Sequence, residues 1–293
     1  MNVKKLNQLA IYSGSIEIAN WVTSTLNLTS LIIDNIYKFE KASDLADKKF
    51  SLIIVTQEKF KPLHNHLSKT GKLLPILVIT NEFDGFNLPK HSKLTIDTIP
   101  LPAITIRLLE HGIKSVMQDF RLNQKLTNLA HYDPLTGAAN RLLFKDRLTQ
   151  TLKSAKRNKR AVSLLYFDLD DFKPVNDLYG HDVGDELLKR FVKLVSSVSR
   201  ETDTIARFGG DEFVLLLPDT LKPELELMAK KIVKCLSKSQ QINNLDIEIK
   251  CSIGATSIAI IGELTKASKE LLESADKAVY QAKKIKGTHY IIN

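Results

Sequence analysis

The chain has 293 residues, with 42 Lys and Arg against 33 Asp and Glu, which gives a net charge of +9 and a pI near 9.3. A hydrophobic content of 43% beside 26% charged residues excludes a disordered or fibrous chain and suits two globular domains. No apolar run reaches the length of a bilayer span, and the cysteines Cys235 and Cys251 lack the spacing of a metal site. We therefore expect a soluble, cytoplasmic protein with reduced cysteines and no membrane partner.

The basic charge raises the question of nucleic-acid binding, because basic surfaces bind phosphate backbones by releasing counterions. Residues 1–118 hold 14 basic and 10 acidic residues, and the remainder holds 28 and 23, so neither part is a concentrated basic tail. We expect nucleotide phosphates, and not nucleic acid, as the anionic partner.

The first part of the chain alternates short apolar runs with helical patterns, as doubly wound α/β sheets do. The expected strands are Gln8–Tyr12, Ser30–Asp34, Leu52–Thr56, Ile76–Thr80 and Lys93–Ile99. Five strands in about 100 residues predict a flavodoxin-like order. The region resembles a response-regulator receiver domain, with residues 74–80 where such domains carry their fourth strand and switch Thr.

The resemblance fails at the positions that phosphorylation needs. Ser13-Gly14-Ser15 stands in place of the acidic cluster after the first strand, and Leu101-Pro102 in place of the usual Lys-Pro. At the end of the third strand Thr56 replaces the acceptor Asp, and Thr has no carboxylate to take phosphate or bind Mg²⁺. We expect a receiver-like domain that is not phosphorylated in the usual way.

A long helix should follow, because Ile106, Leu109, Ile113, Val116 and Phe120 have a 3,4 spacing that resumes, after a shift, in later leucines. The stripe continues past the first domain, which favours a coiled-coil stalk between two chains over a helix packed only on its own domain. The predicted organisation is a receiver-like domain over 1–115, an overlapping stalk over 103–131 and a second domain over 132–293.

The second domain also alternates helices and strands. Helices are expected at Asn140–Arg157, Gly184–Ser199, Lys222–Ser237 and Lys269–Lys284, and strands at Ala161–Phe167, Thr204–Arg207, Phe213–Leu217, Ile247–Thr256 and His289–Ile292. A glycine pair joins two of these strands into a central hairpin, so the sheet must contain antiparallel pairs. The expected fold is an α+β domain with a mixed sheet.

The hairpin stretch Arg207-Phe208-Gly209-Gly210-Asp211-Glu212-Phe213 sets two carboxylates behind the glycines. Glycine permits a tight turn, and carboxylate oxygens are the hard ligands that Mg²⁺ prefers. By itself the stretch fits an ordinary hairpin with solvated acids better than a metal-phosphate site. Asp168, at the end of a predicted buried strand, can meet these acids across the sheet, and this favours a site.

Polar groups also gather at the start of the next helix. Asn176, His181 and Asp185 lie within ten residues of one another. An Asn amide and an Asp carboxylate together match the donor and acceptor edge of guanine.

The second domain resembles the GGDEF domain of diguanylate cyclases, which join two GTP molecules into cyclic di-GMP. The resemblance covers some 160 residues and several motifs in order, which is far more specific than one motif. The motifs are Asp133-Pro134-Leu135-Thr136-Gly137 with Asn140-Arg141, Phe167-Asp168-Leu169-Asp170-Asp171-Phe172-Lys173 with Asn176-Asp177, Gly180-His181-Asp182-Val183-Gly184-Asp185, and Gly209-Gly210-Asp211-Glu212-Phe213.

The resemblance implies Mg²⁺, or Mn²⁺ in its place, with two ions per site. The implied ligands are the side chains of Asp168, Asp211 and Glu212 and the main-chain carbonyl of Leu169. Asp211 would be the general base for the ribose 3′-hydroxyl, beside Glu212, and Lys173 would stabilise charge that develops in the transition state.

For the substrate, the resemblance implies that Asn176 and Asp185 read guanine, with His181 nearby. The amides at Asp171 and Phe172 would cradle the terminal phosphates, together with Lys283. The plain alternatives are a solvated surface lysine for Lys173 and a residue of the helix entry for His181. One GTP per domain implies a homodimer, formed through the stalk, the receiver-like domain or both.

Two further stretches bear on regulation and affinity. Arg200-Glu201-Thr202-Asp203 has the RxxD spacing of the family's inhibitory product site, although a helix-terminal Arg with an Asp cap would give the same pattern. Near the C-terminus the family's Gly-Arg-Asn is lost, since residues 282–289 read Ala-Lys-Lys-Ile-Lys-Gly-Thr-His. The Arg position is absent or displaced onto Thr288, and Lys286 is a substitute point charge.

Three hypotheses remain. An Mg²⁺-dependent diguanylate cyclase, controlled by the first domain and inhibited by its product, is favoured because the metal-position acids are retained. A catalytically silent effector that binds cyclic di-GMP and a basic nucleic-acid-binding regulator are the alternatives. The input to the first domain is open between a small ligand, a regulatory protein and a constitutive dimer scaffold.

Overall fold

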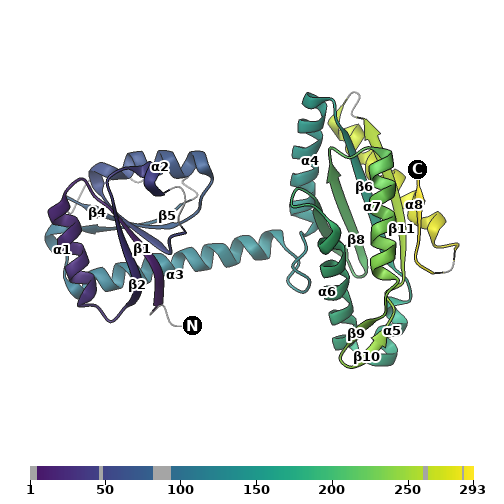
Figure 1. The fold of residues 1–293 in the computed structure, drawn as a ribbon, viewed down its shortest axis with the longest axis horizontal. Coiled ribbons are helices and arrows are strands. Elements are labelled where there is room, and N and C mark those ends of the chain that lie inside the picture. Colours follow the sequence, from purple (N-terminus) through teal and green to yellow (C-terminus); the bar gives the residue numbers. More distant parts are fainter. Residues whose placement is uncertain (1–4, 46–48, 82–93, 260–262, 286) are drawn as a thin grey trace. The chain divides into compact units, whose positions relative to one another are not determined.

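The structure is a computed structural model that describes residues 5–45, 49–81, 94–259, 263–285 and 287–293. Its contacts divide the chain into two compact units, Met1–Leu126 and Thr127–Asn293. One helix, α3 (Ile106–His131), runs through the division, which lies inside the predicted stalk range (Figure 1).

The first unit is built on a five-stranded sheet in which every pairing is parallel. The strand order is β2-β1-β3-β4-β5, compatible with the predicted flavodoxin-like arrangement. The strands are β1 (Lys5–Tyr12), β2 (Ile32–Phe39), β3 (Leu52–Thr56), β4 (Pro75–Thr80) and β5 (Thr95–Pro100), and two helices join α3 here, α1 (Ile16–Asn27) and α2 (Gln57–Thr70). All residues of β3 and β4 are buried, as parallel strands covered on both faces must be.

The second unit contains a mixed sheet of order β12-β11-β6-β8-β7, in which only β11 and β12 are parallel. Its strands are β6 (Ala161–Leu169), β7 (Thr204–Gly209), β8 (Glu212–Pro218), β11 (Cys251–Ala259) and β12 (His289–Ile292), and a small separate hairpin joins β9 (Gln240–Ile242) to β10 (Leu245–Ile247). The predicted mixed sheet is confirmed, but the predicted central place of the hairpin was wrong, because β7 is the edge strand of the order and β8 lies next to it.

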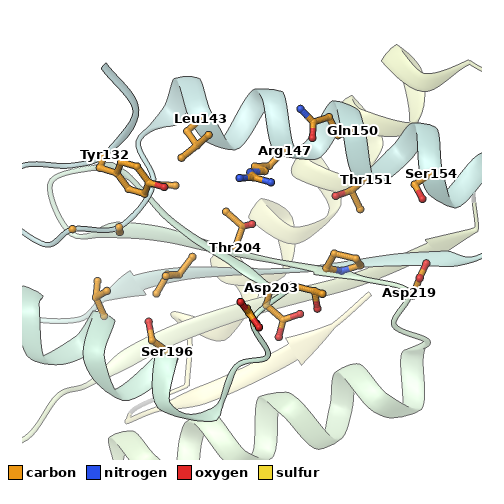
Figure 2. Close-up of a pocket in the computed structure, with 18 residues that line it drawn as sticks. Tyr132, Leu143, Arg147, Gln150, Thr151, Ser154, Ser196, Asp203, Thr204 and Asp219 are labelled. Carbon is orange, nitrogen blue, oxygen red and sulfur yellow. The ribbon is translucent and has the colours of Figure 1, made fainter. Parts of the chain in front are cut away.

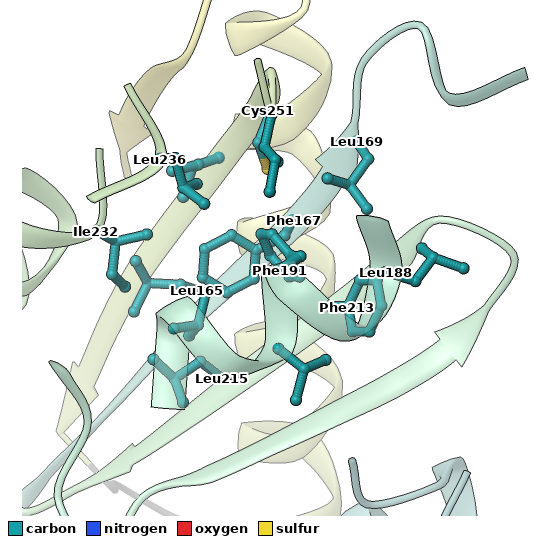
Figure 3. Packing of buried hydrophobic residues seen from close by; sticks show 14 of the residues in the cluster. Leu165, Phe167, Leu169, Leu188, Phe191, Phe213, Leu215, Ile232, Leu236 and Cys251 are labelled. Atoms are coloured by element: carbon teal, nitrogen blue, oxygen red, sulfur yellow. The ribbon is translucent and has the colours of Figure 1, made fainter. Parts of the chain in front are cut away.

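Helices cover both faces of this sheet. One face packs against α4 (Arg141–Asn158) and α8 (Leu264–Ala282), and the other against α6 (His181–Val198) and α7 (Lys222–Leu236). On the α6 and α7 side, three rings meet: Phe191 lies 5.5 Å from Phe167 and 4.8 Å from Phe213, centroid to centroid (Figure 3). Because side chains alternate along a strand, the neighbours of Phe167 and Phe213 point to the opposite face, toward α8.

Several predicted bounds were wrong. The second strand lies at Ile32–Phe39, not Ser30–Asp34, and β11 begins at Cys251, not Ile247, because the apolar residues from 245 to 249 belong to β10 and the loop after it. The last helix starts at Leu264, five residues before the prediction. Lys93, the expected start of the fifth strand, lies outside the described residues.

Candidate active site in the second unit

The tip of the β7–β8 hairpin is held by Arg207. Its guanidinium donates to the Gly210 carbonyl from Nε at 3.0 Å and from a terminal nitrogen at 2.7 Å, and the other terminal nitrogen pairs with Asp133 at 3.1 Å. Gly209 and Gly210 have φ values of 150° and 52°, which only glycine adopts without strain. The turn that carries the acidic pair is therefore fixed from two sides.

Two of the predicted metal-binding carboxylates face each other. Asp168, near the end of β6, is paired in register with Glu212, the first residue of β8. Directly opposite residues on antiparallel strands have Cβ atoms about 4.5–5.5 Å apart. Asp211 lies in the turn before Glu212, and its carbonyl accepts a 3.3 Å hydrogen bond from the Leu169 amide.

The three carboxylates do not form a ready-made metal cluster. Within the described ranges, no three His, Cys, Asp or Glu side chains converge closely enough to hold an ion. The structure brings Asp168 and Glu212 together and leaves Asp211 outside a preformed set. Nevertheless, two opposed carboxylates beside a turn of main-chain carbonyls are a hard-oxygen donor set, so the residues present fit Mg²⁺ or Mn²⁺.

Lys283, just after α8, forms an ion pair with Asp168, with Nζ 2.7 Å from Oδ2. Partial burial would lower the pKa of Lys283, but the hydrogen bond and charge of Asp168, with the charges of Asp170 and Asp211, outweigh it and raise that pKa. Asp170 lies nearby, and burial raises its pKa although Ser252 donates to it at 2.9 Å. A cationic side chain thus already lies at the acidic edge of the sheet.

Asp168, Glu212 and Lys283 line a cavity of about 530 Å³ between β6, β8 and α8. Its lining comprises Tyr166, Asp168, Glu212, Asp276, Lys277, Val279, Tyr280, Gln281, Lys283 and Lys284. Of the expected phosphate-binding residues Lys283 is present, whereas Lys286 lies outside the described residues. The hydroxyl of Thr288 donates to the Ile249 carbonyl at 3.4 Å and accepts from the Cys251 amide at 3.3 Å, so it is engaged in the fold.

A short helix that the sequence did not indicate, α5 (Phe172–Tyr179), starts directly after this edge. Asp171, which precedes it, has a left-handed φ of 58°, a conformation that Asp tolerates better than most residues. No side chain caps the helix, so its first amides are free of a capping partner of that kind. Such amides form an anion-binding site. Lys173, in the first turn, is exposed.

The predicted guanine-reading residues lie on α5 and α6. Asn176 packs against Gly184 so closely that a Cβ on Gly184 would lie 1.8 Å from Asn176 Oδ1. Within the part of the chain that the structure describes, this buried Oδ1 has no hydrogen-bond partner. Asp185 is half-buried and follows Gly184, whereas His181 is exposed at the first position of α6.

The RxxD stretch forms a turn before β7. Asp203 Oδ2 accepts a 2.7 Å hydrogen bond from the Arg200 amide, and burial raises the pKa of Asp203 although this hydrogen bond and the Arg200 charge lower it. The other oxygen, Oδ1, is buried and has no hydrogen-bond partner in the described chain. Asp203 therefore caps the turn, as the plain alternative expected, and keeps one unused acceptor.

Asp203 also lines a second cavity, of about 610 Å³, on the α4 side. Figure 2 shows Arg147, Gln150 and Thr151 of α4 on one side of this cavity and Asp203 on the other. Arg200 is exposed and is not part of the lining.

In the first unit, Thr56 is the last residue of β3, where the sequence comparison predicted the acceptor Asp of a receiver to be missing. Its hydroxyl donates to the carboxylate of Glu58, which also accepts a 3.1 Å hydrogen bond from the Gly14 amide. Burial would raise the pKa of Glu58, but these hydrogen bonds and the Lys59 charge lower it. The end of β3 is therefore occupied by an internal carboxylate that reaches across to the loop after β1.

Three residues at the site were missed from the sequence. Arg207 and Asp133 were quoted as motif members without a role, and their ion pair depends on a separation of 74 positions that no local pattern reveals. Tyr166 was read only as part of an apolar strand. Its place two residues before Asp168, on the same face, is a signal that strand alternation offers.

A family model described as "Diguanylate cyclase, GGDEF domain" matches residues 130–289. The chain is 42% identical over 163 residues to the bifunctional diguanylate cyclase/cyclic di-GMP phosphodiesterase MucR of Pseudomonas aeruginosa, covering 56% of this chain and 23% of MucR. It is 33% identical over 224 residues to the response regulator PleD of Caulobacter vibrioides, covering 72% of this chain and 48% of PleD. The chain thus spans less than half the length of these two relatives.

Among solved structures, the chain is similar to the diguanylate cyclase SiaD of Pseudomonas aeruginosa, crystallised in complex with its activator SiaC. The identity is 28% and the TM-score 0.52, with 64% of this chain and 70% of SiaD covered. None of the described helices contains an apolar stretch of the length that crossing a membrane requires.

Proposed function

The chain belongs to the GGDEF family of diguanylate cyclase domains, and on that premise we propose that it is an active cyclase that converts two GTP into cyclic di-GMP and two pyrophosphates. The observation that carries the proposal is the register pair Asp168–Glu212, with the cation of Lys283 and the start of α5 at the same edge of the sheet. Like charges directly opposite each other destabilise a sheet. Two opposed carboxylates at this edge therefore indicate a binding role and not a stabilising one.

In this proposal Asp168, Asp211, Glu212 and the Leu169 carbonyl hold Mg²⁺, with Mn²⁺ as a substitute and two ions per site. When bound, the metal neutralises phosphate charge and lowers the pKa of the attacking hydroxyl. Asp211 accepts the proton of the ribose 3′-hydroxyl, whose oxygen bonds to the α-phosphorus of the other GTP while the bond to pyrophosphate breaks.

The remaining residues position the substrate. The amides of Asp171 and Phe172, with Lys283, bind the terminal phosphates, and Lys173 stabilises the charge of the transition state. Asn176 and Asp185 pair with guanine, with His181 at its side. The unpartnered Oδ1 of Asn176 supports this role, because the fold itself does not use that atom.

One active site binds one GTP, so two chains must face each other as a homodimer. Helix α3 supports a stalk: residues 122–130 are all exposed, and Leu122, Leu126 and Leu129 are 54%, 56% and 66% accessible. Large apolar side chains on a helix are normally covered, and a second copy of the same helix would cover them. Because the reaction consumes GTP, the proposal places the protein in the cytoplasm.

The first unit is proposed to be the regulatory domain, receiver-like in its strand order but not phosphorylated. The Thr56 hydroxyl and the Glu58 carboxylate occupy the place where an acceptor Asp would stand. The match to a response regulator over 224 residues, more than the 160 of the GGDEF domain, supports this assignment.

The test is to incubate the purified chain with GTP and Mg²⁺ and measure cyclic di-GMP by chromatography. We expect product from the wild type and a loss of at least about 10³-fold in Asp211→Ala, as for the removal of a catalytic base together with a metal ligand. Asp146→Ala, which removes an exposed carboxylate from α4, should be fully active. Absence of product at every protein concentration would contradict the proposal and leave the silent effector.

We also propose a product-binding site at Arg200 and Asp203. The unused Oδ1 of Asp203 beside the second cavity supports it, since a buried acceptor without a donor is costly unless a ligand supplies one. Arg200→Ala should raise the cyclic di-GMP concentration that halves the activity by about tenfold or more, with the initial rate unchanged. An inhibition curve identical to that of the wild type would remove this part of the proposal.

A further inference from the structure

Tyr166 lies beside the proposed metal-binding carboxylates without belonging to the expected set. It precedes Asp168 by two positions on β6, and its partner across to β8 is Val214, two positions after Glu212. Residues two apart on a strand share one face, and a residue is within reach of the diagonal neighbour on the adjacent strand. Tyr166, Asp168 and Glu212 accordingly line the same cavity.

The hydroxyl of Tyr166 is therefore within hydrogen-bonding reach of the Glu212 carboxylate. A tyrosine phenol, with an ordinary pKa of about 10, keeps its proton at neutral pH and can donate it to the carboxylate. A carboxylate has two oxygens, so one can accept this bond while the other stays available.

Aromatic contacts fix the direction of the Tyr166 ring. Its centroid lies 5.9 Å from that of Phe208, edge to face, and Phe208 stands two positions before Gly210 at the hairpin tip. Phe208 is in turn held by Phe144 at 5.0 Å and by the Arg141 guanidinium, 5.0 Å above its ring. Contacts among rings from two strands and one helix thus leave the Tyr166 ring little freedom.

We propose that Tyr166 is a positioning residue that orients the Glu212 carboxylate for cation binding. The inference rests on the proposed function, because it assigns Glu212 to the metal. Partners that hydrogen-bond to metal-binding side chains fix their orientation, and losing one typically weakens metal affinity or activity by about 10–100-fold. If Tyr166 only filled space between α4 and the sheet, removing its oxygen would leave metal binding unchanged.

The experiment compares the full-length wild type with Tyr166→Phe, which retains the ring contact with Phe208 and lacks only the hydroxyl. Mn²⁺ binding is measured by electron paramagnetic resonance in the presence of a non-hydrolysable GTP analogue, so that no turnover is needed. We expect the Mn²⁺ dissociation constant to rise about tenfold in Tyr166→Phe. Tyr290→Phe, a half-buried tyrosine packed on the opposite face of the sheet, is the matched control and should bind Mn²⁺ as the wild type does.

Steady-state rates give a second readout. The Mg²⁺ concentration for half-maximal rate should rise about tenfold in Tyr166→Phe, while kcat at saturating Mg²⁺ stays within about twofold of the wild type. Thermal unfolding of both Phe variants should coincide with that of the wild type, which separates positioning from packing.

The outcomes are distinguishable. Wild-type Mn²⁺ affinity in Tyr166→Phe would overturn this inference and leave the cyclase proposal intact. A wild type that binds no Mn²⁺ would overturn both. A fall in kcat that excess Mg²⁺ does not restore would also overturn it, since a positioning role for the metal ligand requires rescue by metal.

Discussion

At the scale of single residues, the ion pair between Arg207 and Asp133 decides whether the acidic hairpin tip keeps its shape. Burial would raise the pKa of Asp133, but hydrogen bonds from Thr136 and Arg207 and the charge of Arg207 lower it below its ordinary value of about 3.9. A depressed pKa means that the folded state favours the carboxylate more than the unfolded chain does. The resulting stabilisation is complete above about pH 5 and is lost as the pH falls through the folded pKa.

We therefore predict that Asp133→Asn flattens the acid limb of the stability curve. The measurement is the free energy of unfolding from the urea-induced transition of the second unit. Between pH 5 and 3, this free energy should fall more steeply in the wild type than in Asp133→Asn. Asp146→Asn, an exposed acid on α4, should keep the wild-type slope. Parallel curves for wild type and Asp133→Asn would show that the pair with Arg207 contributes nothing.

At the scale of elements, helices α5 and α6 meet through Asn176 and Gly184, and this contact places the proposed guanine reader. A Cβ on Gly184 would lie 1.8 Å from Asn176 Oδ1, far closer than atoms pack. Gly184→Ala should thus displace the Asn176 amide at an overpacking cost of about 1–3 kcal/mol.

In Gly184→Ala, the KM for GTP should rise at least about tenfold, and kcat should fall by a smaller factor. The reason is that the substitution displaces a proposed guanine-binding residue and leaves the proposed catalytic residues in place. Ser197→Ala, an exposed change on the same helix, should match the wild type. A wild-type KM in Gly184→Ala would mean that the close contact has no part in substrate binding.

Some elements were predictable from the sequence and others were not, for physical reasons. Leu52–Thr56 and His289–Ile292 were confirmed residue for residue, because an apolar run bounded by polar residues is a strong local signal. Helix α5 was missed, since it has only eight residues, contains Pro174 and starts after a left-handed Asp171. The placement of Tyr166 and Glu212 on one face of adjacent strands depends on strand register, which local periodicity does not fix.

At the site, motif spacing led to Asp168 and Glu212, and the structure places them opposite each other. It did not lead to Arg207 as the clamp of the hairpin tip, because that role is visible only once residues 133 and 207 are adjacent in space. The ion pair of Lys283 with Asp168 likewise joins elements 115 positions apart, and long-range pairs of this kind have no signature in one sequence.

At the scale of the whole molecule, the proposed half-site in each chain would make activity depend on association. The exposed leucines of α3, Leu122, Leu126 and Leu129, recur at spacings of four and three, as seam positions of a two-stranded coiled coil do. If they form that seam, the stalk raises the local concentration of the second GTP-loaded domain far above its bulk value. The rate per chain should then be constant above the dissociation constant of the dimer and fall in proportion to concentration below it.

Replacing the three leucines with serine should shift this fall in rate to at least about tenfold higher protein concentration. In sedimentation equilibrium the dimer should become a monomer. The rate per chain at saturating protein concentration should stay nearly unchanged. Gln124→Ser with Lys125→Ser makes the same kind of change at exposed polar positions of the helix and controls for the lower helix propensity of serine. Each proposed half-site lies entirely within the second unit of one chain. The coiled-coil contact between α3 helices should therefore change only how often two half-sites meet. A triple-serine variant with the wild-type concentration dependence would place the dimer contact on another surface and leave the half-site chemistry as proposed.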